Sequence, residues 1–177
     1  MCSSDLGIDI DHIAGKDGHY DVVDGQPLGP VTQNDLEQYV RSTHLPFIAK
    51  GVLSQDDAID AALAGCRGLV ISHHHGRIPF GVPPTYILQK IKDVIYTSGL
   101  QFFVDCGIDS GYDAYKAMAL GAHAVAVGRG ILAPLLREGK EGVVKKVRRM
   151  NEQLSEMMMY TGVADTQSFT SSVIHML

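Results

Sequence analysis

Three features of the 177-residue chain predict an α/β fold built on a parallel sheet. Short apolar stretches, rich in β-branched and aromatic residues, alternate with amphipathic stretches of helical length. Alternation at this spacing favours right-handed β–α–β units. In addition, the pattern of Asp57, Ala58, Ala61 and Gly65 before one strand recurs before a later strand, as Asp113, Ala114, Ala117 and Gly121. Repeated units of one build are typical of a (β/α) barrel.

Five strands are predicted, and each ends in, or is directly followed by, a polar residue or a glycine. Their ranges are Gly7–Asp11, Pro46–Lys50, Gly68–Ser72, Gln101–Asp105 and Ala124–Val127. A complete barrel needs eight units and about 250 residues. The sequence therefore leaves two architectures open within a single domain of residues 1–177: a smaller open α/β sheet, or a partial barrel of about five parallel strands with helices at its C-terminal end.

Helix boundaries follow from capping residues. Thr32 and Ser54 are predicted to cap the first two helices, and Gly65 to end the second. Later helices are predicted from Pro83 to about Gly99, Ser110 to Leu120, Ile131 to Arg137, and Glu141 to Tyr160. The Gly-, Asp- and Pro-rich segment His12–Val31 is predicted to be a long loop, and residues 163–177 a weakly structured tail.

Composition narrows the possible partners. A net charge of −5 argues against a general nucleic-acid surface. No apolar run is long enough for a transmembrane helix, and no signal peptide is evident, so we expect a cytoplasmic protein without a membrane partner. Cys2, Cys66 and Cys106 have no close spacing, which suggests free thiols in a reducing compartment.

The polar strand ends predict a common ligand site, because the carboxyl ends of parallel strands lie on one face. Gly128, Arg129 and Gly130 form a turn in which a phosphate could approach the backbone beside a guanidinium, although the same turn suits a plain connection. Asp105 could accept hydrogen bonds from ligand hydroxyls or cap a helix. Lys50 could neutralise a developing anion or be solvated.

The segment after the third strand holds His73, His74 and His75. A shared metal ion is not favoured, because successive residues of an extended chain point in opposite directions. A histidine with an aspartate from another strand suits general-base catalysis, since the carboxylate fixes the imidazole tautomer and stabilises its cation. Arg77 is a natural partner for a substrate carboxylate.

Three motifs resemble the FMN-dependent α-hydroxy-acid oxidases and dehydrogenases, such as glycolate and lactate oxidases, and the resemblance covers nearly all of residues 7–162. The motifs are LPFIAKG, then VISHHHGR against the family's S-N-H-G-x-R, and VDCGIDSGYDAYKAMALGAHAVAVGR against a long D-G-G…G-R pattern. The resemblance implies a (β/α)₈ TIM-type barrel that binds FMN at its C-terminal face and oxidises a small 2-hydroxy acid to a 2-oxo acid. We also expect a homo-oligomer.

The resemblance also implies residue roles. His74 would be the catalytic base, with Asp9 as the carboxylate that orients it and Asp11 in reserve, and Arg77 would bind the substrate carboxylate. The implied FMN contacts are Lys50 near N1 and O2 of the flavin, Ser72 facing the flavin, Asp105 and Gly107 at the ribityl–phosphate region, and Gly128 and Arg129 at the phosphate.

The chain departs from the family pattern at four places: His73 replaces Asn, His75 and Cys106 replace Gly, and Asp109 replaces Arg. An anion at position 109 should weaken FMN binding unless its loop swings away. Two alternative functions stay open. One is an FMN-dependent isomerase like type 2 isopentenyl-diphosphate isomerase, and the other is an inactive flavin- or phosphate-binding remnant.

Overall fold

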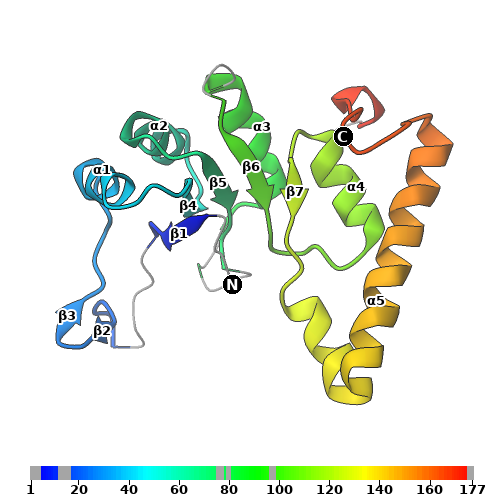
Figure 1. The fold of residues 1–177 in the computed structure, drawn as a ribbon, viewed down its shortest axis with the longest axis horizontal. Helices are drawn as coiled ribbons and strands as arrows, with labels where there is room; N and C mark the ends of the chain where they lie inside the picture. Colours follow the sequence, from blue (N-terminus) through cyan, green and yellow to red (C-terminus); the bar gives the residue numbers. More distant parts are fainter. Residues whose placement is uncertain (1–4, 12–16, 75–77, 79–80, 96–98, 175–177) are drawn as a thin grey trace. The chain divides into compact units, whose positions relative to one another are not determined.

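The computed structural model describes residues 5–11, 17–74, 78, 81–95 and 99–174 (Figure 1). The chain forms two compact units, Met1–Gln101 and Phe102–Leu177. The five predicted strands are all present, with ends that differ by a few residues. Among the described residues, no helix has both the length and the apolar character needed to cross a membrane.

The first unit is built on three parallel strands in the order β1, β4, β5, namely Leu6–Asp9, Phe47–Val52 and Gly68–Ile71. β1 pairs with β4 from Leu6 opposite Phe47 to Asp9 opposite Lys50. The core side chains Ala49, Val52, Leu69 and Ile71 are fully buried. Such burial is expected of parallel strands, because crossover helices cover the sheet.

Three helices of the first unit begin where their capping residues predict. α1 (Gln33–Arg41) and α2 (Gln55–Ala64) each begin with a capping box. The side chain of Thr32 or Ser54 accepts a hydrogen bond from the backbone N–H of an aspartate three residues later. The carboxylate of that aspartate in turn accepts one from the backbone N–H of the capping residue. Gly65 ends α2 with φ +93°, a left-handed conformation that favours glycine. α3 spans Pro84–Val94 and ends before the predicted Gly99; residues 96–98 lie outside the described part.

The prediction of an uninterrupted loop over His12–Val31 is wrong. An antiparallel hairpin forms there between β2 (Val22–Val23) and β3 (Gln26–Pro27). Asp24 and Gly25 at its tip have φ +48° and +79°, as a two-residue type I′ turn requires. The Asp24-Gly25 pair, with Val22-Val23 before it and Gln26-Pro27 after it, is therefore a hairpin signal. Glycine, aspartate and proline are also common in loops, so composition alone predicts only a loop.

The second unit contains most of β6 (Gln101–Val104), together with α4 (Gly111–Ala119) and β7 (Ala124–Val125). β6 and β7 are parallel, with Phe103 opposite Ala124. A short 3₁₀ helix, η1 (Arg129–Ile131), leads into α5 (Leu132–Thr161). Gly139, with φ +59° and ψ −142°, interrupts α5 between the two helices that the sequence predicts there.

α4 packs closely on the second part of α5. A Cβ on Gly111 would overlap the backbone of Met150, so only glycine permits this approach. The buried Tyr115 donates its hydroxyl to Thr161 Oγ1 at 2.7 Å and contacts the ring of Phe169 edge-on, with centroids 5.3 Å apart. Phe169 precedes a second 3₁₀ helix, η2 (Ser171–Val173), so part of the predicted weakly structured tail makes a defined contact.

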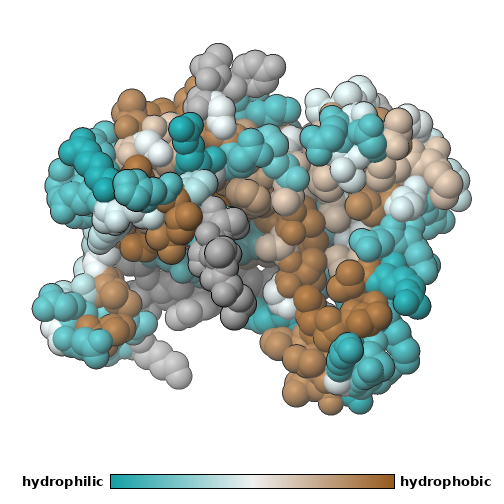
Figure 2. Space-filling model, in the orientation of Figure 1, coloured by the Kyte–Doolittle hydropathy of each residue, from teal (hydrophilic) through white to brown (hydrophobic). Residues whose placement is uncertain are grey.

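The first part of α5 carries a hydrophobic surface. Leu132, Leu135 and Leu136 are exposed, Leu136 by 85 %. Figure 2 shows this brown patch over the beginning of α5.

Candidate functional site

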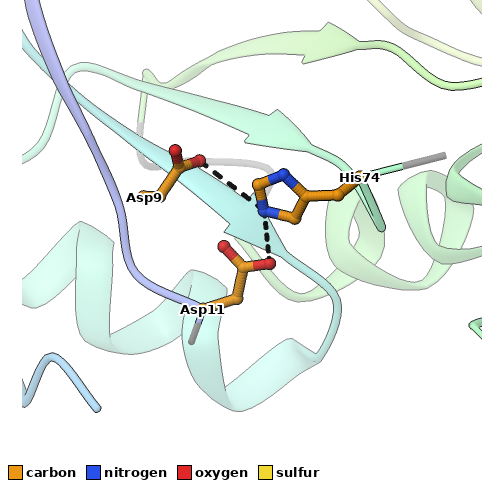
Figure 3. A group of neighbouring side chains, drawn as sticks. All are labelled: Asp9, Asp11 and His74. Carbon is orange, nitrogen blue, oxygen red and sulfur yellow. Dashed lines mark ion pairs between the residues drawn. The ribbon is translucent and has the colours of Figure 1, made fainter. Parts of the chain in front are cut away.

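Four side chains from the ends of three adjacent strands come together in the first unit. His74 Nε2, just after β5, lies 2.5 Å from Asp11 Oδ2 and 3.8 Å from Asp9 Oδ1 (Figure 3). Lys50 Nζ, on β4, lies 2.5 Å from the same Asp9 oxygen. The structure thus brings together Asp9, Asp11, Lys50 and His74, as the strand-end argument predicts.

Asp11 is the carboxylate nearer to His74, although the resemblance ranks Asp9 first. Asp9 and Asp11 are two residues apart, so an extended strand would place them on one face and could not separate their roles. β1 ends at Asp9, however, and Asp11 follows it toward His74. The His74–Asp11 contact is an ion pair at 2.5 Å.

Ser72 fixes the backbone on which His74 stands. The fully buried Ser72 hydroxyl accepts a hydrogen bond from the His74 amide, N to Oγ 3.2 Å. His74 has φ +50°, a left-handed conformation that costs a non-glycine residue about 1 kcal/mol or more. Such strain is often found at functional sites, where the surrounding structure maintains it.

Gly51 is a site residue to which the sequence assigned no role. It has φ +86°, and the pairing of β4 with β5 shifts register between Lys50 and Val52. A Cβ on Gly51 would overlap the Asp11 carboxylate. A glycine inside a strand is a signal for a bulge or a close approach. Here Gly51 provides the space that Asp11 needs beside His74.

A cavity of about 730 Å³ borders this cluster. Asp9, Asp11 and His74 line one side, and Leu28, Pro30 and Tyr39 contribute apolar surface. The volume lies in the range of small-molecule sites.

The same cluster contains the ligand atoms that a metal ion would need. Atoms of Asp9, Asp11 and His74 lie within 4.8 Å of one another. Lys50 already contacts one of the two Asp9 oxygens, however, and a neighbouring ammonium group disfavours a bound cation. The expectation that the site holds no metal stays a prediction.

The predicted phosphate-end residues lie in the second unit. Asp105 Oδ1 accepts a hydrogen bond from the Cys106 thiol at 2.8 Å, and Cys106 has φ +64°. A Cβ on Gly107 or Gly128 would meet no atom within 4 Å, so a ligand can reach the backbone at both glycines. Arg129, next in the chain, is exposed.

Asp109 has not swung away from the turn after β7. A Cβ on Gly130 would overlap Asp109 Oδ1. Lys146, on α5, donates to the Asp109 backbone oxygen at 2.5 Å.

Two of the singled-out residues, His75 and Arg77, lie outside the described residues. The substrate-binding role of Arg77 therefore stays a prediction. His73 is half-buried, and its Cβ lies 3.0 Å from the position that a Cβ on Gly81 would take. It thus packs against the backbone after the histidine segment.

Comparison with known proteins identifies relatives that include lactate and 2-hydroxyacid oxidases. L-lactate oxidase of Roseobacter sp. (strain GAI101) is 33 % identical over 160 residues, which are 90 % of this chain and 43 % of that protein. 2-Hydroxyacid oxidase 1 of Homo sapiens is 33 % identical over 145 residues, 81 % of this chain and 39 % of that protein. A crystal structure of mandelate oxidase with benzoyl-formic acid superposes with a TM-score of 0.74 at 35 % identity, covering 80 % of this chain and 42 % of the other.

The chain thus spans less than half the length of these relatives. The five-strand α/β architecture is consistent with part of the barrel that the resemblance implies. The family model for FMN-dependent dehydrogenase matches residues 12–176. The chain therefore belongs to the FMN-dependent dehydrogenase family.

Proposed function

We propose that this chain carries the catalytic base and part of the flavin site of an FMN-dependent enzyme that oxidises a small 2-hydroxy acid to a 2-oxo acid. The observation that carries the proposal is the contact of His74 with Asp11, beside Lys50 and a cavity of small-molecule size. The names of the relatives, which include lactate and 2-hydroxyacid oxidases, support the same substrate class.

His74 is the proton acceptor in this proposal. It takes either the hydroxyl proton of the substrate or the proton on C2, and both routes leave an imidazolium at Nε2. Asp11, 2.5 Å away, stabilises that cation and fixes the ring. Asp11 thus takes the role that the resemblance gives to Asp9. Arg77 binds the substrate carboxylate through its planar guanidinium.

Cofactor contacts are proposed separately for Lys50 in the first unit and for residues of the second unit. FMN, when bound, supplies the acceptor for the two electrons that leave the substrate. Lys50 offers a positive charge to the flavin ring, and Asp9 orients the ammonium group. Ser72, whose hydroxyl accepts a hydrogen bond from the His74 amide, is the residue proposed to face the flavin. The open backbone at Gly107 and Gly128 fits the ribityl and phosphate end of FMN, and Asp105 and Arg129 are near these glycines in sequence. The Asp109 carboxylate does not fit a phosphate, because both are negatively charged.

We further propose a cytoplasmic homo-oligomer without nucleic-acid or membrane partners. Cys66 and Cys106 are free thiols, which suits a reducing compartment. The exposed leucines at the beginning of α5 are suited to contact another copy of the chain.

Anaerobic bleaching of bound flavin tests the proposed function. The chain is loaded with FMN and mixed with lactate, glycolate or mandelate while flavin absorption is followed. We expect bleaching, and we expect His74→Ala to abolish it while FMN binding persists. His73→Ala, in the same segment, is the matched control and should bleach. Reduction at an unchanged rate in His74→Ala would refute the role of His74.

Two other outcomes identify the alternative functions. Flavin that binds but is not bleached by any hydroxy acid favours the isomerase. A chain that takes up no flavin at all favours the inactive remnant.

A further inference from the structure

An aspartate side chain lies against the turn that a phosphate would be expected to approach. Asp109 Oδ1 contacts Gly130, and a Cβ there would overlap it. The Lys146 ammonium group reaches the backbone oxygen of Asp109, not its carboxylate. The loop after β6 is thus tied to α5 with a negative charge against the Gly128–Gly130 turn.

The charges around this turn do not favour a dianion. The segment from Asp105 to Asp113, which includes the first turn of α4, carries three carboxylates. Asp113 accepts hydrogen bonds from Ser110 at the start of α4, and Asp105 accepts one from Cys106. Among the described residues, no ion pair is found to the Asp109 carboxylate, and Lys146 contacts the backbone oxygen of this residue instead. Arg129 and Lys146 are the basic residues that this part of the unit offers a phosphate.

The backbone itself remains accessible. Gly128 is exposed, and a Cβ there would meet nothing within 4 Å. Steric exclusion is therefore not the reason a phosphate would be disfavoured at this turn. The obstacle is electrostatic and is located in one side chain, Asp109.

We propose that Asp109 is a specificity-determining residue that cancels the contribution of the phosphate to flavin binding, so that this chain binds FMN no more tightly than riboflavin. The inference rests on the proposed function for the presence of a flavin site. It goes beyond that function because it predicts that the site does not discriminate between FMN and riboflavin.

Titration of the full chain with FMN and with riboflavin, followed by flavin fluorescence, tests the proposal. We expect the two dissociation constants to agree within about threefold in the unchanged chain, since opposing charges cancel the gain from the phosphate. Asp109→Asn should give FMN an advantage of about tenfold, and Asp109→Arg one of about a hundredfold, because hydrogen bonds to charged groups have about this strength. Glu141→Gln, an exposed position on α5, removes the same charge and should change neither constant.

A clear preference of the unchanged chain for FMN, or no gain in Asp109→Arg, would overturn the proposal. A second measurement separates its failure from failure of the proposed function. Inorganic phosphate is added, and amide shifts of Gly128 and Gly130 are followed by NMR. Shifts in Asp109→Arg but not in the unchanged chain support the role of Asp109 even if no flavin binds, which would refute the proposed function alone. Equal shifts in both proteins, or shifts in neither, refute the role of Asp109.

Discussion

Asp9 and Lys50 lie directly opposite each other on the parallel strands β1 and β4, and their side chains meet at 2.5 Å. The same Asp9 oxygen lies 3.8 Å from His74 Nε2. Asp9 therefore lies between Lys50, the proposed flavin contact, and His74, the proposed base, whereas Asp11 contacts His74. The two carboxylates differ in partner, and this difference can be tested.

Asp11→Asn should impair catalysis more than Asp9→Asn. The amide at position 11 cannot stabilise an imidazolium, so flavin reduction by the substrate should slow by about 10²- to 10⁴-fold. Asp9→Asn leaves the His74–Asp11 contact in place and should mainly alter FMN affinity through Lys50. Stopped-flow reduction and flavin titration of both variants measure the two effects. A larger loss of rate in Asp9→Asn would restore Asp9 as the orienting carboxylate.

Gly51→Ala should disrupt the site from within the sheet. The new methyl group would overlap the Asp11 carboxylate, and φ +86° is unfavourable for alanine. We expect a loss of stability of about 1–3 kcal/mol in urea unfolding, together with loss of His74-dependent flavin reduction. Gly18→Ala is a matched control, because Gly18 also has positive φ but no atom within 4 Å of a Cβ. Stability loss in both variants with the site intact would mean that backbone strain alone explains Gly51.

Cys106→Gly should stabilise the chain. Cys106 occupies the left-handed region at φ +64°, which costs a residue with a Cβ about 1 kcal/mol. Removing the Cβ relieves this cost, although the hydrogen bond from the thiol to Asp105 is lost. Cys106→Ala loses the same hydrogen bond and keeps the strain, so the difference in unfolding free energy between the two variants isolates the backbone effect. Equal stability of the two variants would contradict it.

Cys66 should be the less reactive of the two described thiols. It is buried, and desolvation raises its pKa to about 11, whereas Cys106 is half-exposed. Alkylation near pH 8 followed by peptide mass spectrometry should therefore label Cys106 and spare Cys66 until urea unfolds the chain. Fast labelling of Cys66 in the folded protein would contradict its burial.

The same shift gives a pH dependence of known sign. The folded-state pKa lies above the unfolded value of about 8.5, so the unfolded chain loses the proton first. The stabilising contribution is complete below about pH 8.5. It declines as the pH rises toward the folded value of about 11. Cys66→Ala should show a flatter stability profile across this window.

Local signals explain why most of the fold could be predicted. Thr32, Ser54 and Ser110 each begin a helix at the predicted position, because a capping box needs only residues close in sequence. Gly139 likewise separates the two predicted C-terminal helices through its own backbone conformation. The hairpin at Asp24 and Gly25 also depends on a local signal, because an Asp-Gly pair favours a two-residue turn.

Which strand-end residues meet in the first unit could be predicted, but the geometry of their contacts could not. The strand ends indicated that Asp9, Asp11, Lys50 and His74 would meet. Which aspartate contacts His74 most closely depends on two features: β1 ends at Asp9, and Gly51 in β4 leaves space for the Asp11 carboxylate. The residues next to the two aspartates in sequence do not indicate either feature. The position of Asp109 against Gly130 also depends on a contact between segments distant in sequence.

The matching helices α2 and α4 have a consequence for the origin of the chain. Ser54 and Ser110 adopt nearly the same backbone angles, at φ −133°, ψ 166° and φ −140°, ψ 165°, and Gly65 and Gly121 both take positive φ after the helix. Each segment thus contains its own helix N-cap residue and its own glycine after the helix. This autonomy would let such units be copied in tandem and diverge independently, as expected if the barrel grew by duplication of an ancestral β–α module.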